Sequence, residues 1–257
     1  MSPTAVLEPR VARLPGGPVD YLLRRNPRSR GLRVTLDPAR GVLVSVPPAT
    51  RRGWANPESA VERFLVEREA WLRRHLARHD RARAALASAA ADGRVRYLGE
   101  WHAVRVETGA PRARTTVERV GGESGDELLV RRSPSERRGT VRILEVWFRA
   151  RAAEAIDRAI ERHADALGVR PGRIAILDPK SRWGSAARTG RLMFSWRLVL
   201  APPEALDGVV VHELAHLRVF GHGPAFWALV ESRLPDHADR RRWLRRHAAE
   251  LHGALAA

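Results

Sequence analysis

The stretch VVVHELAHLRVFGH (residues 209–222) constrains the fold of this chain more than any other. His212 and His216 stand four residues apart, and residues with this spacing lie on one face of a helix. The three valines before His212, together with Leu214 and Leu217, require that the helix is buried on one side. Because a buried histidine needs a polar partner, the chain has to fold so that both imidazoles meet something that binds them.

A metal ion satisfies both imidazoles at once. The chain has no cysteine, so any metal site must use His, Asp or Glu. Glu213 is displaced by one residue around the helix, from where it can reach a metal-bound water without being a ligand. This H-E-x-x-H pattern predicts Zn²⁺ with an open coordination position, at which water loses a proton near neutral pH. Glu213 would be the general base that takes this proton and delivers it to a leaving amine.

A third ligand is needed, and two residues are candidates for it. His222 follows His216 by six residues, and Gly221 allows the chain to turn back toward the ion. The alternative is a downstream carboxylate, of which Glu231 is the nearest. The spacing of His222 matches the metzincin motif, but Val219 stands where that motif has glycine and no methionine follows. The metzincin interpretation therefore fails, and we expect His222 to be the ligand.

The remaining patterns predict an α+β chain. Alternating apolar residues predict strands over 32–36, 42–46 and about 95–107. Apolar residues at helical spacing predict helices over about 57–89 and 139–167. Further expected elements are strands at 173–178 and 190–200, a helix from the prolines at 202–203 through the histidine motif, and two helices after Gly223.

The chain organisation follows from a change in composition. Residues 108–139 are rich in Gly, Arg, Thr, Ser and Glu, which predicts a loop or a long hairpin at a boundary. We expect an N-terminal β-rich subdomain with one long helix over 1–110, a loop or linker over 111–138, and the H-E-x-x-H metal domain over 139–257.

The charge and the hydropathy of the chain limit which kinds of partner it can have. The net charge is +17, and Lys180 is the only lysine, so the excess is arginine. Such an excess reflects either a coding bias or attraction to polyanions such as nucleic acid. No run of eighteen apolar residues predicts a membrane helix, and the first residues lack the apolar segment of a signal peptide. We therefore expect a cytoplasmic protein without a membrane partner.

Two long segments carry a family resemblance. HELAHLRVFGHGPAFWALVE and PKSRWGSAARTGRLMFSWRLVLAPPEALDGVVVHELAH closely resemble the YgjP-like metallopeptidases, bacterial proteins related to the SprT-like zinc proteases and more loosely to the gluzincins. The resemblance is strong over about 140–250 and weaker over 20–107, and residues 108–139 match nothing in it. It implies a zincin-like catalytic domain of helices and a small antiparallel sheet, with one Zn²⁺ per chain held by His212, His216 and His222. It also implies Glu213 as general base and a polypeptide substrate.

The resemblance also marks the KSRWGS loop, for which physical reasoning suggests roles. Lys180 and Arg182 could lie near the cleft and stabilise an oxyanion, whereas the alternative is that Arg182 and Trp183 only pack the loop. The strand at 190–197 is a candidate for pairing with an extended substrate. Two further expectations concern the surroundings of the ligands: Phe226 and Trp227 as core residues behind His222, and Asp207, Asp236 or His237 as partners that orient the imidazoles.

A different class of function remains as the alternative. The arginine excess favours a SprT-like protease associated with nucleic acid, or a basic protein that simply binds nucleic acid. The absence of cysteine argues against a zinc-ribbon DNA-binding module, and no helix-turn-helix or RNP-type signature occurs in the sequence. Hydrolysis of a non-peptide amide at the same metal site is a third alternative.

Overall fold

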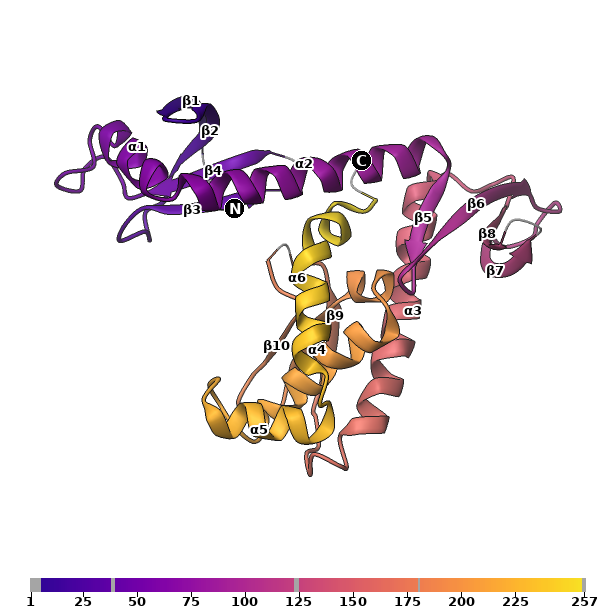
Figure 1. The fold of residues 1–257 in the computed structure, drawn as a ribbon. Coiled ribbons are helices and arrows are strands. Elements are labelled where there is room, and N and C mark those ends of the chain that lie inside the picture. The colour runs from indigo at the N-terminus through magenta and orange to yellow at the C-terminus, as the bar shows by residue number, and fades with distance from the viewer. Residues whose placement is uncertain (1–5, 38–39, 123–124, 180, 256–257) are drawn as a thin grey trace. The chain divides into compact units, whose positions relative to one another are not determined.

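The structure, a computed structural model, describes residues 6–37, 40–122, 125–179 and 181–255. The chain forms two compact units, residues 1–84 and 85–257, each with its own hydrophobic core. Over the described residues the fold is α+β, as predicted, with six α-helices and three small mixed sheets (Figure 1). The helices are α1 (Glu58–Glu67), α2 (Glu69–Ala91), α3 (Thr140–His163), α4 (Pro203–Ala215), α5 (Pro224–Arg233) and α6 (His237–Gly253). None of them is both long and apolar enough to cross a bilayer.

The first unit is built on one four-stranded sheet. Its strands are β1 (Leu7–Leu14), β2 (Gly17–Arg25), β3 (Arg33–Asp37) and β4 (Gly41–Val46), in the order β1-β2-β4-β3. β2 and β4 are parallel, and the other two pairs are antiparallel. Buried valines of β4 pack with Val61 and Leu65 of α1 and with Leu72 of α2. β3 and β4 occur where alternating residues predicted strands.

The single long helix predicted over 57–89 is two helices. The chain leaves helical geometry at Arg68 (φ −116°, ψ 16°), between α1 and α2. The N–H of Arg68 bonds to the carbonyl of Leu65, only three residues back, so the turn is tighter than an α-helical one. Glu69, the first residue of α2, accepts hydrogen bonds from the Gly16 backbone (2.9 Å) and from Arg73 (2.7 Å). The Gly16 bond joins α2 to the β1–β2 turn, a long-range contact that helical periodicity does not reveal.

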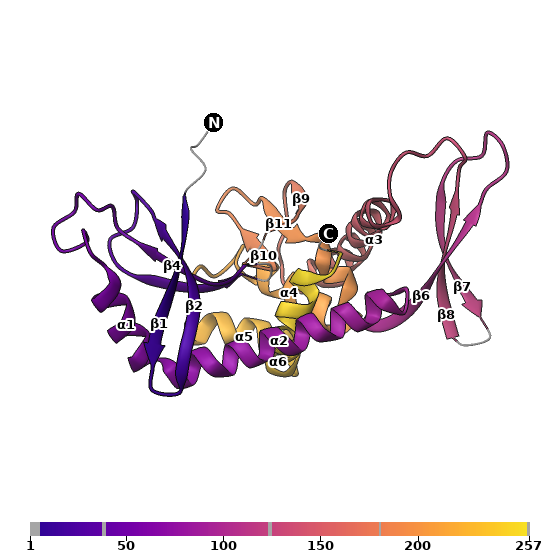
Figure 2. The same ribbon diagram turned by 90° about the horizontal axis from the view of Figure 1, so that it is seen from above.

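The second unit begins with another four-stranded sheet. Its strands are β5 (Arg94–Tyr97), β6 (Glu100–Thr108), β7 (Thr116–Gly122) and β8 (Gly125–Arg132), in the order β5-β6-β8-β7. β6, β7 and β8 run side by side (Figure 2). The strand expected at 95–107 is a hairpin, because Leu98 and Gly99 turn the chain with positive φ. β7 and β8 form the long hairpin that was one of two alternatives for residues 108–139. The three-part domain division stays a prediction.

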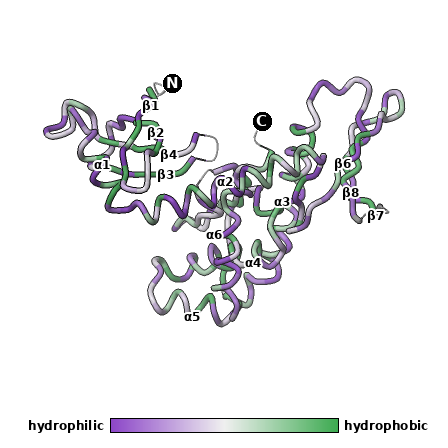
Figure 3. The backbone as a smooth tube through the Cα atoms, turned by 45° about the horizontal axis from the view of Figure 1, so that its top comes forward, coloured by the Kyte–Doolittle hydropathy of each residue, from purple (hydrophilic) through white to green (hydrophobic). Residues whose placement is uncertain are grey.

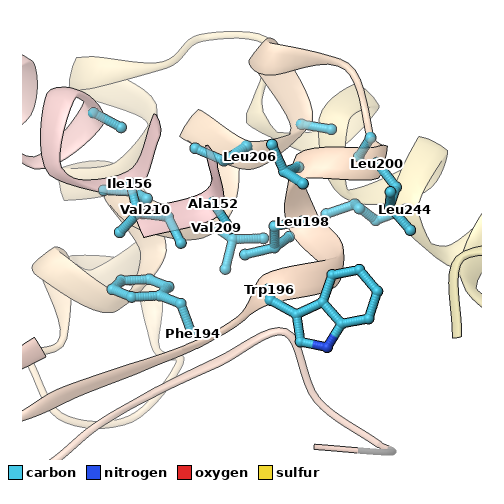
Figure 4. Close-up of a cluster of buried hydrophobic side chains, with 14 of the residues drawn as sticks. Ala152, Ile156, Phe194, Trp196, Leu198, Leu200, Leu206, Val209, Val210 and Leu244 are labelled. Atoms are coloured by element: carbon cyan, nitrogen blue, oxygen red, sulfur yellow. The ribbon is translucent and has the colours of Figure 1, made fainter. Parts of the chain in front are cut away.

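The largest core lies in the second unit, around the helix that carries the histidine motif. A three-stranded sheet in the order β10-β11-β9 comprises β9 (Ile174–Leu177), β10 (Gly184–Ala186) and β11 (Leu192–Ser195). β11 is antiparallel to β10 but parallel to β9, so the sheet expected here as antiparallel is a mixed one. A 3₁₀ helix, Trp196–Leu200, follows β11 directly. Figure 4 shows buried side chains of α3, β11, the 3₁₀ helix, α4 and α6 in this core, among them Ala152, Ile156, Phe194, Trp196, Leu198, Val210 and Leu244.

The strand predicted over 190–200 is wrong in its second half. Trp196, Leu198, Val199 and Leu200 are all buried, so burial does not alternate as it does in a strand with one solvated face. The Ser195 hydroxyl accepts a hydrogen bond from the N–H of Arg197 (3.3 Å) and caps the 3₁₀ turn. A short apolar segment, interrupted here only by Arg197, is compatible with either structure, which is why periodicity failed here.

Candidate metal centre

Three histidines converge at the end of α4. His212 is in the last turn of this helix, His216 is its C-cap, and His222 lies in the turn before α5. Gly221, at φ +95°, takes the left-handed conformation that brings the chain back. The Nε2 atom of His222 lies 3.1 Å from that of His212 and 3.2 Å from that of His216.

These distances fit one shared ion. Ligand nitrogens at Zn–N distances of about 2.0–2.1 Å in tetrahedral geometry are separated by about 3.3–3.4 Å. The ligand atoms of the three histidines all lie within 4.8 Å of one another, so they can hold a single metal ion. The expected third ligand, His222, is in this cluster. Glu231, the alternative, is exposed on α5 and outside it.

The surroundings orient the imidazoles. The Nδ1–H of His216 donates to the carbonyl of Val219 (3.2 Å), which leaves Nε2 without a proton and free to act as a ligand. The ring of Phe226, fully buried, stacks on His216 at 4.4 Å and meets His212 and His222 edge-on at 4.9 Å. Phe226 is therefore the core residue expected behind the site, whereas Trp227 is only half-buried.

The electrostatics favour neutral imidazoles. Burial, with smaller contributions from His216 and His222, lowers the pKa of His212 to about 3. Burial also lowers the pKa of His216. Since a metal binds only deprotonated imidazole nitrogen, both side chains are in the form that coordinates a metal at neutral pH.

Glu213 lies beside the cluster in a different environment. It is 6% exposed, and burial raises the pKa of its carboxyl to about 7, an effect that the charge of Arg182 opposes. A carboxyl group that titrates near neutral pH can both accept and return a proton there. The structure therefore brings together the four residues that the motif singled out.

Gly184 is part of this site, and the sequence reasoning assigned it no role. A Cβ atom at position 184 would lie 2.6 Å from Cγ and 2.7 Å from Oε1 of Glu213, closer than real contacts allow. The first residue of β10 therefore has to be glycine if the carboxylate is to stay where it is. The only signal was a glycine inside the KSRWGS loop, and its partner is 29 positions away in the sequence.

The other candidates are placed as follows. Lys180 lies outside the described residues. Arg182 is exposed, and Trp183 stacks on His252 of α6 with ring centroids 4.2 Å apart, so Trp183 does pack the loop. The three expected orienting residues have other contacts: Asp207 binds Arg162 and His163, Asp236 binds Arg240, and His237 stacks on Trp227. The Val219 carbonyl and the Phe226 ring hold the imidazoles instead.

The strand expected to pair with substrate is also corrected. β11, within the predicted 190–197 segment, is the central strand, with β10 on one side and β9 on the other. Both of its edges are therefore occupied. β10 is one of the two edge strands of the sheet, and it begins at the residue that lies against Glu213.

A buried helix with three convergent imidazoles and an adjacent carboxylate is the arrangement of metal-dependent hydrolases with an H-E-x-x-H motif. The chain belongs to the YgjP-like family, whose metallopeptidase-domain model matches residues 30–247. This confirms the family resemblance. No curated protein matches the chain. No solved structure matches it either.

Proposed function

We propose that this protein is a zinc-dependent metallopeptidase that hydrolyses peptide bonds. The observation that carries the proposal is the convergence of three Nε2 atoms next to the buried carboxyl of Glu213. His212, His216 and His222 would hold one ion per chain. Zinc, when bound, supplies a Lewis acid that polarises a carbonyl and lowers the pKa of water. Glu213 accepts the proton of the attacking water and returns it to the amine nitrogen that leaves.

The proposal includes a zincin-like catalytic architecture and a substrate strand. α4 lies against β10, because the side chain of Glu213 in α4 is in contact with Gly184 in β10. The Trp183 carbonyl and the Ala187 N–H bond toward β11, so the alternation of a strand points the backbone groups of Gly184 and Ala186 the other way. An extended peptide can pair with this edge in front of the metal centre.

The basic residues of the KSRWGS loop complete the proposal. Arg182 is close enough for its charge to act on the pKa of Glu213. In the proposed mechanism this exposed guanidinium stabilises the negative charge that develops on a substrate carbonyl oxygen. We keep the same role as a proposal for Lys180.

The deciding experiment measures metal content and peptidase activity together, in the parent and in Glu213→Gln. We expect one zinc per chain in both proteins and a loss of activity of about 10²–10⁴-fold in the variant, because only the proton acceptor is removed. Glu231→Gln is the matched control and should retain both properties. Equal activity in Glu213→Gln and the parent would refute the assigned role. Zinc that is retained in His222→Ala would show that a residue other than His222 is the third ligand.

A second candidate function rests on the net charge of +17. If the arginine excess serves nucleic-acid binding, affinity for DNA should fall steeply with salt, because phosphate contacts release counterions. Binding of a duplex oligonucleotide at several salt concentrations measures this slope. If the affinity for DNA depends only weakly on salt, the arginine excess is explained by a coding bias. The metallopeptidase would then be the one proposed function.

A further inference from the structure

A cavity of about 190 Å³ adjoins the metal centre between α4 and α6. His212, Glu213 and Gly184 line it on the side of the site. The buried side chains that form its apolar wall are Ala205, Val209, Val230 and Leu244. The space therefore opens directly beside the groups assigned to the chemistry, where a substrate side chain next to the cleaved bond would lie.

One face of α6 lines this cavity with basic residues. His237, Arg241 and Arg245 follow one another at intervals of four residues, which places them along a single helix face. The guanidinium of Arg241 lies over the ring of Trp227, 4.3 Å from its centroid. Among the described residues that line the cavity, Glu213 is the one acid.

Arg241 and Arg245 differ from Arg240 and Arg242 on the same helix. Arg240 pairs with Asp236, and Arg242 pairs with Asp239. In the part of the chain that the structure describes, neither Arg241 nor Arg245 forms an ion pair. Burial and the like charge of Arg245 lower the pKa of Arg241, so the two cations repel each other at the edge of the cavity. An anion that enters the cavity would relieve this repulsion.

We propose that the cavity is a substrate subsite for a carboxylate next to the scissile bond. The inference rests on the proposed peptidase function and names its substrate class: a peptide with an acidic side chain, or a free C-terminal carboxylate, at this position. A guanidinium binds a carboxylate through two parallel hydrogen bonds, while the apolar wall takes the carbon stem. A basic side chain would be rejected by the same residues.

Binding to the zinc-free, full-length protein tests the subsite without catalysis. Calorimetric titration compares 3-phenylpropionate with its uncharged amide, and the absence of zinc prevents the carboxylate from coordinating it. We expect the acid to bind about tenfold more tightly, as hydrogen bonds to a charged group predict. Arg241→Gln/Arg245→Gln should abolish this preference, whereas Arg242→Gln/Arg246→Gln, with the same charge change outside the cavity, should retain it. No binding, equal binding of both probes, or equal loss in both double variants would overturn the subsite.

The zinc-loaded protein then separates the two sources of the carboxylate. Digestion of a degenerate peptide library should give cleavage sites enriched in Asp and Glu next to the cut if a side chain is recognised. Cleavage confined to the last bonds, and lost when peptides are amidated, indicates the chain terminus. Cleavage without either preference contradicts the inference. If the parent cleaves no peptide, the peptidase proposal fails, and the calorimetric result still decides whether the cavity binds a carboxylate.

Discussion

A single methyl group at position 184 should separate metal binding from catalysis. In Gly184→Ala the new Cβ would clash with the carboxylate of Glu213, while the three histidines lie on other elements. We expect zinc content to stay at the parent level and peptidase activity to fall by at least about tenfold, because a base displaced by a few tenths of an ångström loses its alignment. Gly121→Ala, which meets open space, is the control. Unchanged activity in Gly184→Ala would show that the Glu213 side chain can move away from the new Cβ without losing its function.

The contrast between Gly184 and the histidines shows which site residues a sequence can reveal. His212, Glu213 and His216 were predictable because helical spacing alone decides their relative positions. His222 was predictable once Gly221 supplied the turn. Gly184 and the Val219 carbonyl act through tertiary contacts or the backbone, and neither leaves a local pattern. The same holds for Asp207, whose partners, Arg162 and His163, come from α3.

The pH dependence of stability should contain a contribution from His252. Burial first, and then the charge of Arg197, lowers the pKa of His252 to about 4. Below pH 6.5 this histidine is protonated in the unfolded chain but stays neutral in the folded chain. Its contribution therefore decreases the free energy of unfolding as the pH falls from 6.5 toward 4. The full effect is at most about 3 kcal/mol.

Urea unfolding of the zinc-free protein at pH 7.5 and pH 5 measures this contribution. His252→Gln should lose less stability between the two pH values than the parent does. The comparison uses the difference between pH values, because the variant also loses the stacking on Trp183 and is destabilised at both. His247→Gln, on the same helix, is the control. An identical pH response in His252→Gln and the parent would contradict the assignment.

At the scale of elements, the edge of β10 should be sensitive to proline. Ala186→Pro removes the one N–H of this residue, which points away from β11, so the ladder between the two strands stays intact. We expect KM for a peptide substrate to rise while zinc content and the melting temperature remain close to those of the parent. An unchanged KM would show that substrate does not pair with this edge.

The elements themselves were predicted to different degrees. α4 and its motif followed from apolar residues that surround the histidines. The break at Arg68 and the 3₁₀ helix at Trp196–Leu200 did not. The bond from Gly16 to Glu69 next to the break is long-range, and burial on both sides of Arg197 has no strand-like alternation. α2 was predicted as helical, but where it begins was not. The helix is hydrophilic, as the tube in Figure 3 shows, so few apolar positions mark its ends.

At the scale of the whole molecule, two cores predict two responses to metal. The core of residues 1–84 and the core of residues 85–257 share no residue, and all three histidines belong to the second. In differential scanning calorimetry, zinc should raise the melting temperature of one transition and leave the other unchanged. When the free zinc concentration is one hundred times Kd, zinc stabilises the second unit against unfolding by about 2.7 kcal/mol. A single transition that shifts as a whole would show that the two units unfold together.

The position of Gly184 has a consequence for how such a protein can evolve. This one residue belongs to the edge strand and borders both Glu213 and the cavity, so a change there affects all three together. The arginines of α6, by contrast, line the cavity from a helix that carries neither the edge strand nor the three histidines. If these arginines form the proposed subsite, substrate preference can change on α6, one arginine at a time, while Gly184 and Glu213 stay as they are. Selection for a new peptide would act first on Arg241 and Arg245 and last on the glycine.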